Sequence, residues 1–316
     1  MEHITDHNIE QTSPCVVTLG NFDGLHMGHR ALIGLAKEYA QKESMKSVVF
    51  TFNPHPMLYF NNRKLNKLIM SREEKLYAVN RLGVDIFIEY PFEEIHSLTP
   101  EEFAVELLFK KLKAKVVIVG DNFRFGAKHA GTPDMLKHFG KEHGTKVIVV
   151  NDIMLGGDTV SSTRVRKCLV DRDLPMANRL LTEPYFMIGT VVKGKELGRT
   201  IGFPTVNIVA DPDKLFPPNG VYATRTEYKG KTYSGITNVG INPTVNGTRK
   251  IVETFIFDFN EFIYGEKLKI NFFKWVRDER KFDGIDALMA EIAKNTVTVK
   301  EYFESDEFTE WKNKGY

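Results

Sequence analysis

The sequence predicts two domains: an α/β domain with a parallel sheet, followed by a smaller β domain that ends in a helix. Three observations support this fold class. The chain has 316 residues, which suits about two domains of ordinary size. Short apolar stretches alternate with helical stretches in the first half. Beyond Glu183-Pro184, strand-like stretches follow one another, so we place the domain boundary between residues 182 and 183.

The first half alternates between strand-like and helical segments. Five apolar stretches predict strands: Val16–Leu19, Ser47–Phe52, Val84–Ile88, Lys115–Val119 and Lys146–Val150. Four segments between them predict helices: His29–Gln41, Ser71–Leu82, Thr99–Leu112 and Pro133–His143. Thr99, Pro100 and Glu102 form a strong helix start, with an N-cap, a proline at the first position and a capping box. Strands separated by helices imply crossover connections and a parallel sheet covered on both faces.

The second half predicts mostly strands. They are Tyr185–Val192, Gly220–Glu227, Lys231–Val239, Val252–Phe259 and Lys267–Trp275, with turn residues such as Lys229-Gly230 and Asn246-Gly247 between them. Helical periodicity returns at Ile285–Ala293 and Val299–Phe303. A run of strands followed by terminal helices predicts a small antiparallel barrel or sandwich capped by a helix.

Composition limits the classes of function. The chain is 42% hydrophobic and 27% charged, which is typical of globular proteins, and only the first dozen residues predict no element. A net charge of +2 does not favour nucleic acid as a partner. No apolar run reaches the roughly 18–20 residues of a membrane span, and the N-terminus lacks the features of a secretory signal. Cys15 and Cys168 suggest no disulfide framework, so we expect a cytoplasmic protein. Separately, we expect no structural metal, and we favour a monomer.

The stretch GNFDGLHMGH, residues 20–29, carries the first candidate site. It follows the first predicted strand, and ligands bind at the carboxyl ends of strands in open parallel sheets. Gly20 and Gly24 allow tight turning, and the free N–H groups of the following helix favour phosphate. His26 and His29 share one face of the first helical turn, where they can donate to the phosphate oxygens of a nucleotide.

Two other interpretations of this stretch remain open. The histidines could bind a metal, but a zinc site needs further ligands, and Cys15 and His55 are the nearby candidates. The glycines could be ordinary loop glycines.

Four segments together resemble the nucleotidylyltransferase domain of the bacterial bifunctional riboflavin kinase/FAD synthetases. Residues 20–29 are similar to its HxGH signature, and TFNPHP (51–56), GDNFRFG (120–126) and SSTRVR (161–166) resemble three further motifs. The resemblance implies a Rossmann-like domain over residues 1–182 that adenylylates FMN to FAD, with His26 and His29 as catalytic residues. It implies nucleotide or phosphate contacts at Gly20, Phe22, Asp23, Gly24, Gly28, Ser162, Thr163 and Arg166, and flavin contacts at Asn53, Asn122, Phe123, Arg124 and Phe125.

Alternatives remain for two of these segments. Phe123 and Phe125 could stack on a flavin or an adenine, or they could pack in the core. Arg164 and Arg166 near a helix N-terminus are electrostatically unfavourable unless an anion binds there, or they could be solvated surface side chains.

A second candidate site lies at residues 189–208, GTVVKGKELGRTIGFPTVNI. Lysine and arginine residues alternate with the glycines at 194, 198 and 202, which predicts a flexible basic loop able to wrap phosphates, although a solvated charged hairpin has the same composition. The chain has neither a P-loop nor the protein-kinase motifs. The stretch resembles the riboflavin kinase signature GRxxGFPTxN, which implies a six-stranded antiparallel barrel with a C-terminal helix over residues 183–316.

The resemblance also implies roles for residues of this domain. Thr205 and Asn207 would contact Mg²⁺ and the nucleotide phosphates, together with Lys193, Gly198 and Arg199. Glu253 in VETFIFDF would be the catalytic base that takes the proton of the ribityl 5′-hydroxyl, and Arg277 in RDERKF would contact flavin or phosphate. From pattern alone, Glu253 could equally lie at a solvated strand end and Arg277 in a surface salt bridge.

The implied protein is a two-domain enzyme that converts riboflavin to FMN and FMN to FAD with ATP and Mg²⁺. Two rivals are an enzyme with one silent domain and a flavin-binding regulatory protein. The presence of His26, His29 and Glu253 argues against the second. A nucleotidylyltransferase for another substrate would explain residues 20–29 and 161–166, but not residues 198–207.

Overall fold

The computed structural model describes residues 1–313 except residues 7, 8, 10–12, 61–66, 195–197, 199–201 and 245–246, and without the side chains of residues 242–249. The chain forms two compact units. The first comprises Met1–Lys67 and Lys75–Ser161, and the second comprises Leu68–Glu74 and Ser162–Tyr316.

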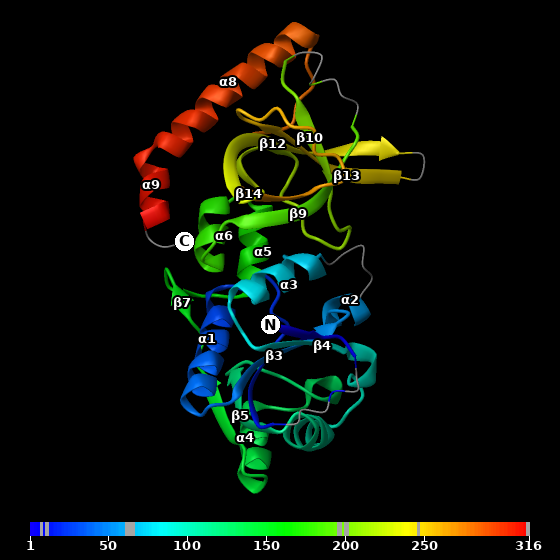
Figure 1. Ribbon diagram of the computed structural model, residues 1–316, viewed down its shortest axis with the longest axis vertical. Coiled ribbons are helices and arrows are strands. Elements are labelled where there is room, and N and C mark those ends of the chain that lie inside the picture. Colours follow the sequence, from blue (N-terminus) through cyan, green and yellow to red (C-terminus); the bar gives the residue numbers. More distant parts are fainter. Residues whose placement is uncertain are drawn as a thin grey trace. The chain divides into compact units, whose positions relative to one another are not determined.

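A six-stranded parallel sheet forms the centre of the first unit (Figure 1). Its order is β1-β4-β3-β2-β5-β6. The strands are β1 (Glu2–Ile4), β2 (Cys15–Leu19), β3 (Lys46–Asn53), β4 (Ile86–Pro91), β5 (Ala114–Gly120) and β6 (Lys146–Val150). The five predicted strands and their parallel pairing are confirmed. The expectation of no element in the first dozen residues was wrong, because β1 pairs with β4.

Helices connect these strands: α1 (Met27–Lys42), α2 (Pro56–Phe60), α3 (Arg72–Arg81), the π-helix η2 (Glu102–Lys111) and α4 (Pro133–Glu142). Short 3₁₀ turns η1 (Phe92–Glu94) and η3 (Ala127–His129) and a small β7 (Met154–Leu155) and β8 (Asp158–Thr159) hairpin complete the unit. The predicted capping box is confirmed, since Thr99 N donates to Glu102 Oε2 at 2.8 Å and Glu102 N donates to Thr99 Oγ1 at 3.2 Å.

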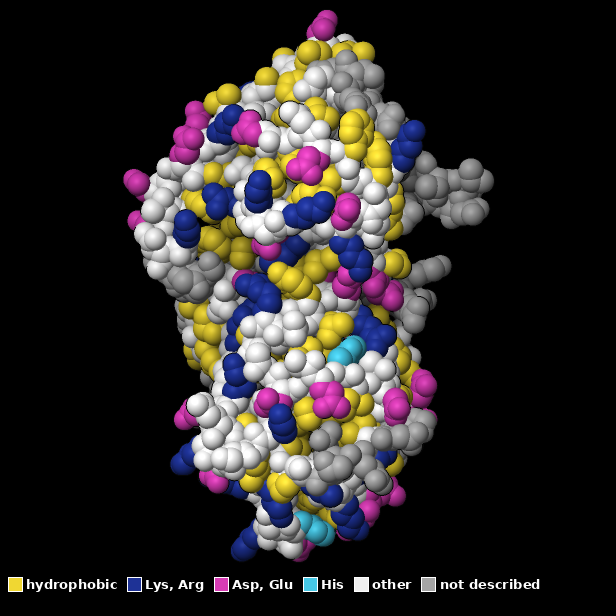
Figure 2. Space-filling model, viewed as in Figure 1, with side chains coloured by type: hydrophobic (Ala, Val, Ile, Leu, Met, Phe, Trp, Pro, Cys, Tyr) yellow, Lys and Arg dark blue, Asp and Glu magenta, His cyan; other side chains and the backbone are white. Residues whose placement is uncertain are grey.

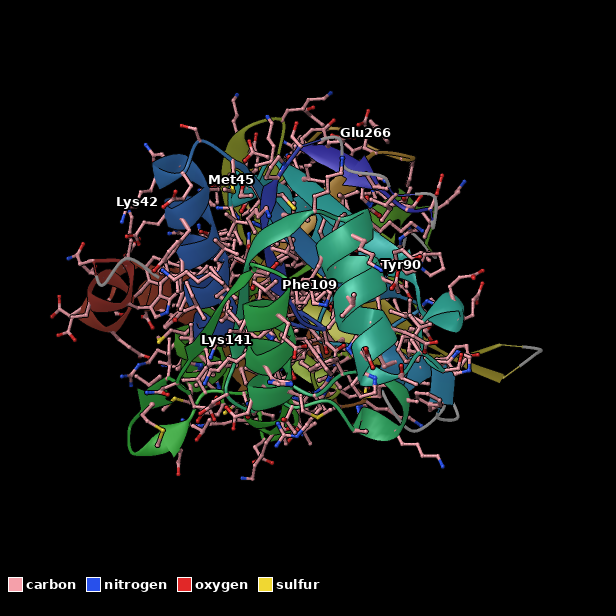
Figure 3. The ribbon with its side chains drawn as sticks, turned by 90° about the horizontal axis from the view of Figure 1, so that it is seen from below. Lys42, Met45, Tyr90, Phe109, Lys141 and Glu266 are labelled. Atoms are coloured by element: carbon pink, nitrogen blue, oxygen red, sulfur yellow. The ribbon has the colours of Figure 1, made fainter. Side chains whose placement is uncertain are left out.

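Helices cover both faces of the sheet, as predicted. Leu32 and Ala36 of α1 pack against Val16 and Ile118 on one face. On the other face, helix η2 and Leu136 of α4 pack against the alternate residues of the same strands. Figure 3 shows α1, which ends at Lys42, and η2, which carries Phe109, on opposite sides of the strands. The central strands are therefore buried on both faces.

The strand order creates a switch point between β2 and β5. From β2 the chain builds outward through β3 and β4, and from β5 it builds outward in the other direction to β6. The crevice outside the carboxyl ends of strands at such a point is where open α/β sheets bind ligands. Residues 20–29 follow β2 and residues 120–126 follow β5, so both motifs lie at this crevice.

The second unit contains a closed barrel in the order β10-β13-β12-β11-β14-β9. Its strands are β9 (Tyr185–Val192), β10 (Thr205–Val209), β11 (Gly220–Tyr228), β12 (Lys231–Thr244), β13 (Gly247–Ile256) and β14 (Lys267–Arg277). Its helices include α5 (Ser162–Val170), α6 (Leu174–Leu181), α8 (Ile285–Glu304) and α9 (Asp306–Asn313).

The predicted antiparallel six-stranded barrel with a C-terminal helix is confirmed. The periodicity of the sequence does not indicate β10, and it splits α8 into two helices where the structure has one. Asn246 of the predicted turn between β12 and β13 lies outside the described residues.

The barrel strands present two different faces. Thr224, Thr237 and Thr254 are fully buried on one face, where their hydroxyls form a chain with O···O distances of 2.8 Å. Alternate residues point to the other face. There Val221 and Ile236 pack against Val299 of α8, which runs along the barrel in Figure 1. The space between this outer face and α8 holds the second site.

The face of the protein in Figure 2 shows no large region of one charge. Figure 2 shows Lys and Arg side chains interspersed with Asp and Glu on the face in view. Within the described parts of the chain, no helix combines the length and the apolar character needed to span a bilayer.

Candidate active sites

The loop after β2 adopts an unusual backbone. Gly24 has φ 88°, and Phe22 and Leu25 also have positive φ values of 48° and 44°. Residues other than glycine rarely adopt positive φ values, so the surrounding structure must hold the loop in place. Asp23 in this loop is 1% exposed. His26 then caps the N-terminus of α1 through its Nδ1, which accepts a hydrogen bond from His29 N at 3.4 Å.

The two histidines of the motif stack on each other. Their ring centroids are 3.7 Å apart with planes inclined by 18°, and the Phe22 ring meets His29 edge-on at 5.2 Å. A Cβ on Gly28 would lie 3.3 Å from the His26 ring, so glycine leaves room for the stack. Nδ1 of His29 is buried and has no hydrogen-bond partner among the described residues. The imidazole is therefore held by packing and keeps hydrogen-bonding capacity for a ligand.

Burial lowers the pKa of His29 well below its ordinary value, and the nearby His26, Lys75 and His55 act in the same direction. His29 is therefore neutral at pH 7 and donates through a single ring N–H. A polyphosphate beside this ring would favour the charged form and raise the pKa again.

Lys75 of α3 is a site residue that the sequence did not reveal. Its Nζ donates to Asn21 O at 2.8 Å, and Thr51 Oγ1 donates to the same carbonyl at 3.2 Å. Lys75 is 5% exposed, and burial lowers its pKa, against the attraction of Asp23 and Glu89. This lysine supports the loop from a helix more than 50 residues away in sequence. One lysine in a charged helix gives no sequence signal of such a role.

The predicted flavin residues lie at or beyond the carboxyl ends of β3 and β5, the two strands that flank β2. Asn53 ends β3, and Asn122 Nδ2 beyond β5 donates to Asp152 Oδ1 at 3.2 Å. Arg124 Nη1 donates to Phe123 O at 2.8 Å. The rings of Phe123 and Phe125 stack at 5.6 Å, but Phe125 is 4% exposed and belongs to the core. Phe123 is half-buried and has the more accessible ring.

The SSTRVR motif lies at the N-terminus of α5, as predicted. Ser162, Thr163 and Arg166 belong to the second compact unit, whereas residues 20–29 belong to the first. Their contact with nucleotide stays a prediction.

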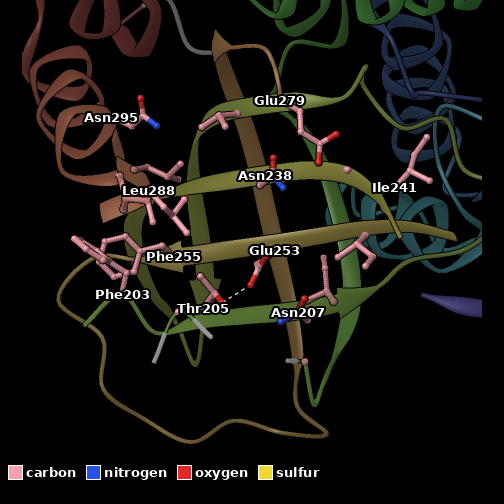
Figure 4. A pocket seen from close by; sticks show the side chains of 18 of the residues that line it. Phe203, Thr205, Asn207, Asn238, Ile241, Glu253, Phe255, Glu279, Leu288 and Asn295 are labelled. Carbon is pink, nitrogen blue, oxygen red and sulfur yellow. Dashed lines mark hydrogen bonds between the residues drawn. The ribbon is translucent and has the colours of Figure 1, made fainter. Parts of the chain in front are cut away.

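The second site is a cavity of about 670 Å³ on the outer face of the barrel (Figure 4). This volume suits a small-molecule ligand. Six of the predicted residues line it: Lys193, Gly198, Thr205, Asn207, Glu253 and Arg277. Arg199 lies outside the described residues.

Strand register places Glu253 at the centre of a polar row. It is paired with Asn207 of β10 on one side and with Asn238 of β12 on the other. Thr205 Oγ1 donates to Glu253 Oε1 at 2.5 Å (Figure 4). The half-buried carboxylate thus lies in a cavity and not at a solvated strand end.

The backbone of the glycine-rich loop packs closely against this row. A Cβ on Gly194 would lie 2.2 Å from Asn207 Nδ2, and one on Gly198 would lie 2.4 Å from Phe203 O. Position 198 therefore requires glycine, because a Cβ would overlap a backbone oxygen, whereas a Cβ at position 194 would displace the Asn207 side chain. Three hard oxygen donors lie beside this loop: Thr205 Oγ1, the Asn207 side chain and the Glu253 carboxylate. Such a set suits a magnesium ion whose other ligands are water molecules and phosphate oxygens.

Arg277 forms an ion pair and also lines the cavity, and its contact with flavin or phosphate stays a prediction. Its Nε lies 3.1 Å from Glu291 Oε1 of α8, yet the side chain lines the cavity and lies over the Phe282 ring at 5.4 Å. The carboxylate of Glu291 therefore fixes the guanidinium at the cavity wall.

Three further polar residues near this cavity were not predicted. Asn219 Nδ2 donates to Glu279 Oε2 at 3.0 Å, and Lys250 Nζ donates to Asn219 Oδ1. Burial lowers the pKa of Lys250, against the attraction of Glu279. These residues come from separate segments, so no local motif could have connected them.

Across the described residues, no group of three or more His, Cys, Asp and Glu side chains is arranged to hold a metal ion. The oxygen set beside Glu253 contains one carboxylate and two neutral side chains, which is consistent with a metal held mainly by a nucleotide.

Comparisons with known proteins find relatives for both halves of the chain. A family model described as FAD synthetase matches residues 8–164, and one described as Riboflavin kinase matches residues 181–303. The bifunctional riboflavin kinase/FMN adenylyltransferase of Escherichia coli K12 is 38% identical over 94% of this chain and 96% of its own length. The enzyme of that name from Bacillus subtilis is 36% identical, over 95% and 97%.

The chain belongs to this bifunctional family. It is a riboflavin kinase and an FMN adenylyltransferase. A Streptococcus pneumoniae crystal structure described as a macrolide-efflux protein has the same fold, with a TM-score of 0.85 and 32% identity over 95% of this chain and 99% of that one. Its description refers to that protein, whereas the two family models and the curated relatives agree on the flavin activities of the family.

Proposed function

We propose that riboflavin is phosphorylated in the barrel cavity, with Glu253 as the general base. Glu253 accepts the proton of the ribityl 5′-hydroxyl while that oxygen forms a bond to the γ-phosphorus of ATP. The bond from the γ-phosphorus to the bridging oxygen breaks, and ADP leaves. The observation that carries this proposal is the half-buried Glu253 carboxylate in a polar row inside a cavity.

Thr205 and Asn207 are the proposed magnesium ligands of this site. A bound Mg²⁺ would neutralise charge on the ATP phosphates. Thr205 has a second role, because its bond to Glu253 Oε1 orients the carboxylate. Lys193, Gly198 and Arg199 are proposed to contact the phosphates, and Arg277 to contact the flavin or a phosphate.

FMN is adenylylated, in our proposal, at the carboxyl end of β2. A phosphate oxygen of FMN forms a bond to the α-phosphorus of ATP, and pyrophosphate leaves. His26 and His29 donate hydrogen bonds to the charge that develops on the phosphates. The proposed nucleotide contacts are Gly20, Phe22, Asp23, Gly24, Gly28, Ser162, Thr163 and Arg166, and the proposed flavin contacts are Asn53, Asn122, Phe123, Arg124 and Phe125.

Product analysis of two variants tests these assignments. Purified protein is incubated with ATP and Mg²⁺ and with either riboflavin or FMN, and the flavins are separated by chromatography. Glu253→Gln should abolish FMN formation and keep FAD formation from FMN. His29→Ala should keep FMN formation and lose FAD formation. A folded Glu253→Gln protein that lost both activities, or a His29→Ala protein with unchanged FAD synthesis, would refute the respective assignment.

We also propose a monomer in the reducing cytoplasm. Both cysteines are free thiols, and burial raises the pKa of the Cys15 thiol to about 12, so it stays protonated and unreactive. Light scattering of the purified chain measures its mass, and a dimer would contradict the monomer.

A further inference from the structure

Helix α8 carries a buried polar side chain that neither the motifs nor the proposed mechanism uses. Leu288, Ile292, Asn295 and Val299 recur at intervals of four, three and four residues and form the stripe that faces the barrel. Asn295 is the polar member of this otherwise apolar stripe. It is 4% exposed and lines the cavity.

The Asn295 amide makes no hydrogen bond to any other described residue. By contrast, the neighbouring Thr296 hydroxyl donates to Ile292 O within the same helix at 2.8 Å. The amide atoms of Asn295 are not among the fully enclosed side-chain atoms that lack a partner, so they open into the cavity that the residue lines. An amide without a partner in an otherwise apolar stripe is unfavourable. An amide that lines a ligand cavity can be satisfied when the ligand arrives.

The cavity has a polar end and an apolar end, and Asn295 lies at the apolar end. Figure 4 shows Thr205, Asn207 and Glu253 together on the strands, and Asn295 on α8 on the side of Leu288, Phe255 and Phe203. The Phe203 ring meets the Phe255 ring edge-on at 5.3 Å, which forms an aromatic wall. Because Glu253 must reach the 5′-hydroxyl, the ribityl chain occupies the polar end and the flavin ring extends toward the aromatic wall.

The isoalloxazine ring needs one polar partner at such a wall. Its dimethylbenzene side is apolar, whereas its pyrimidine side carries C2=O, N3–H and C4=O. One amide supplies both a donor and an acceptor, so it can pair with N3–H and an adjacent carbonyl together. We propose that Asn295 is a specificity residue of the kinase, which binds the pyrimidine edge of riboflavin. This inference rests on the assignment of the barrel cavity as the kinase site.

The test pairs a variant with a flavin analogue. Asn295→Leu keeps the size of the side chain and removes its hydrogen bonds. The KM for riboflavin should rise about tenfold or more, as expected for a ligand whose polar edge is left unpaired. The kcat and the KM for ATP should stay within about twofold. Thr296→Val on the same helix is the matched control, and its KM values should not change.

3-Methylriboflavin provides the second arm, because it lacks the N3–H donor. The unmodified enzyme should have a KM for this analogue about tenfold above that for riboflavin. Asn295→Leu should have similar KM values for both flavins, because the interaction is already lost. The analogue arm with the unmodified enzyme does not depend on whether the variant folds.

Three outcomes would overturn the proposal. The first is that the unmodified enzyme has equal KM values for riboflavin and 3-methylriboflavin. The second is that a folded Asn295→Leu protein keeps the same ratio between these two KM values. The third is that Asn295→Leu raises the KM for ATP and not the KM for riboflavin. The last outcome would assign the amide to adenine. A kinase that remains active with Glu253→Gln would instead refute the cavity assignment, which separates the two failures.

Discussion

The surroundings of His29 keep its imidazole neutral at pH 7. A solvated histidine is partly charged near pH 6.5. Burial is the main cause that lowers the pKa of His29, and the stacked His26 and the buried Lys75 lower it further because their positive charges would repel a second one. The side chain that we propose to contact phosphates is thus uncharged at pH 7 without a ligand.

This depressed pKa predicts how stability depends on pH. The unfolded chain takes up a proton at His29 below about pH 6.5, whereas the folded protein does not. The contribution of His29 to the free energy of unfolding should therefore be largest above pH 6.5. Below that pH it should decrease by at most about 1.4 kcal/mol per pH unit. Denaturant titrations of the unmodified protein and of His29→Gln between pH 7.5 and 5 measure the effect.

The comparison isolates His29 because other groups titrate equally in both proteins. His29→Gln should lose stability less steeply as pH falls. Parallel pH profiles of the two proteins would mean that His29 is protonated in the folded state.

At the scale of elements, the glycine-rich loop before β10 depends on close backbone contact. Gly198→Ala should lower kcat/KM of the kinase by about tenfold or more, because the new Cβ would overlap Phe203 O and displace the chain that leads to Thr205. FAD synthesis from FMN should not change. Kinase assays with both substrates varied, together with FMN adenylylation assays, check this prediction.

Gly230→Ala is the matched control for that variant. Gly230 also lies in the barrel and has φ 76°, but a Cβ at this position would meet no other heavy atom within 4 Å. Alanine there strains the turn by about 1 kcal/mol without reaching the cavity. If both variants lost kinase activity to the same extent, general destabilisation would explain the loss.

The structure of α8 shows why its continuity was not predicted. Thr296, Val297, Thr298 and Val299 form a β-branched run that lowers helix propensity. In the folded chain, the Thr296 and Thr298 hydroxyls donate to carbonyls four residues earlier, and Val299 is fully buried against the barrel. Tertiary packing therefore overrides a local preference that suggests two helices.

At the scale of the whole molecule, one segment of the first half completes the second unit. Leu68–Glu74 belongs to that unit by its contacts. Glu74 Oε2 lies 2.6 Å from Lys214 Nζ, and both side chains are fully buried. Glu74 Oε1 accepts a hydrogen bond from Ile188 N at 2.9 Å, and Lys214 Nζ donates to Ile69 O at 2.8 Å.

This buried pair predicts that one substitution has effects of different size in two contexts. In the full chain, Lys214→Met should lower the free energy of unfolding by about 3 kcal/mol, because it leaves the buried Glu74 carboxylate without its cationic partner. In a fragment of residues 162–316, which lacks Glu74, the same substitution should lower the free energy of unfolding much less, because the carboxylate that it would leave without a cation is absent. Thermal and denaturant unfolding of the four proteins measure the two differences.

A destabilising effect of the same size in both contexts would contradict this account. The experiment also bears on the domain boundary after residue 182, which stays a prediction. A fragment of residues 183–316 would lack Asn178 as well, whose side chain accepts from Tyr185 N at 2.8 Å and donates to Phe272 O at 2.9 Å. We expect it to be less stable than the 162–316 fragment.

The sequence alone determined the fold class, the parallel and antiparallel sheets and the family. It could do so because strand and helix periodicity, capping residues and short motifs such as residues 20–29 are local patterns. Only the tertiary structure decided that Lys75 supports the first loop, that Glu253 lies in a row between Asn207 and Asn238, and that Asn295 faces the cavity. These relations join residues far apart in the chain, and strand register and helix packing fix them, whereas no local pattern encodes them.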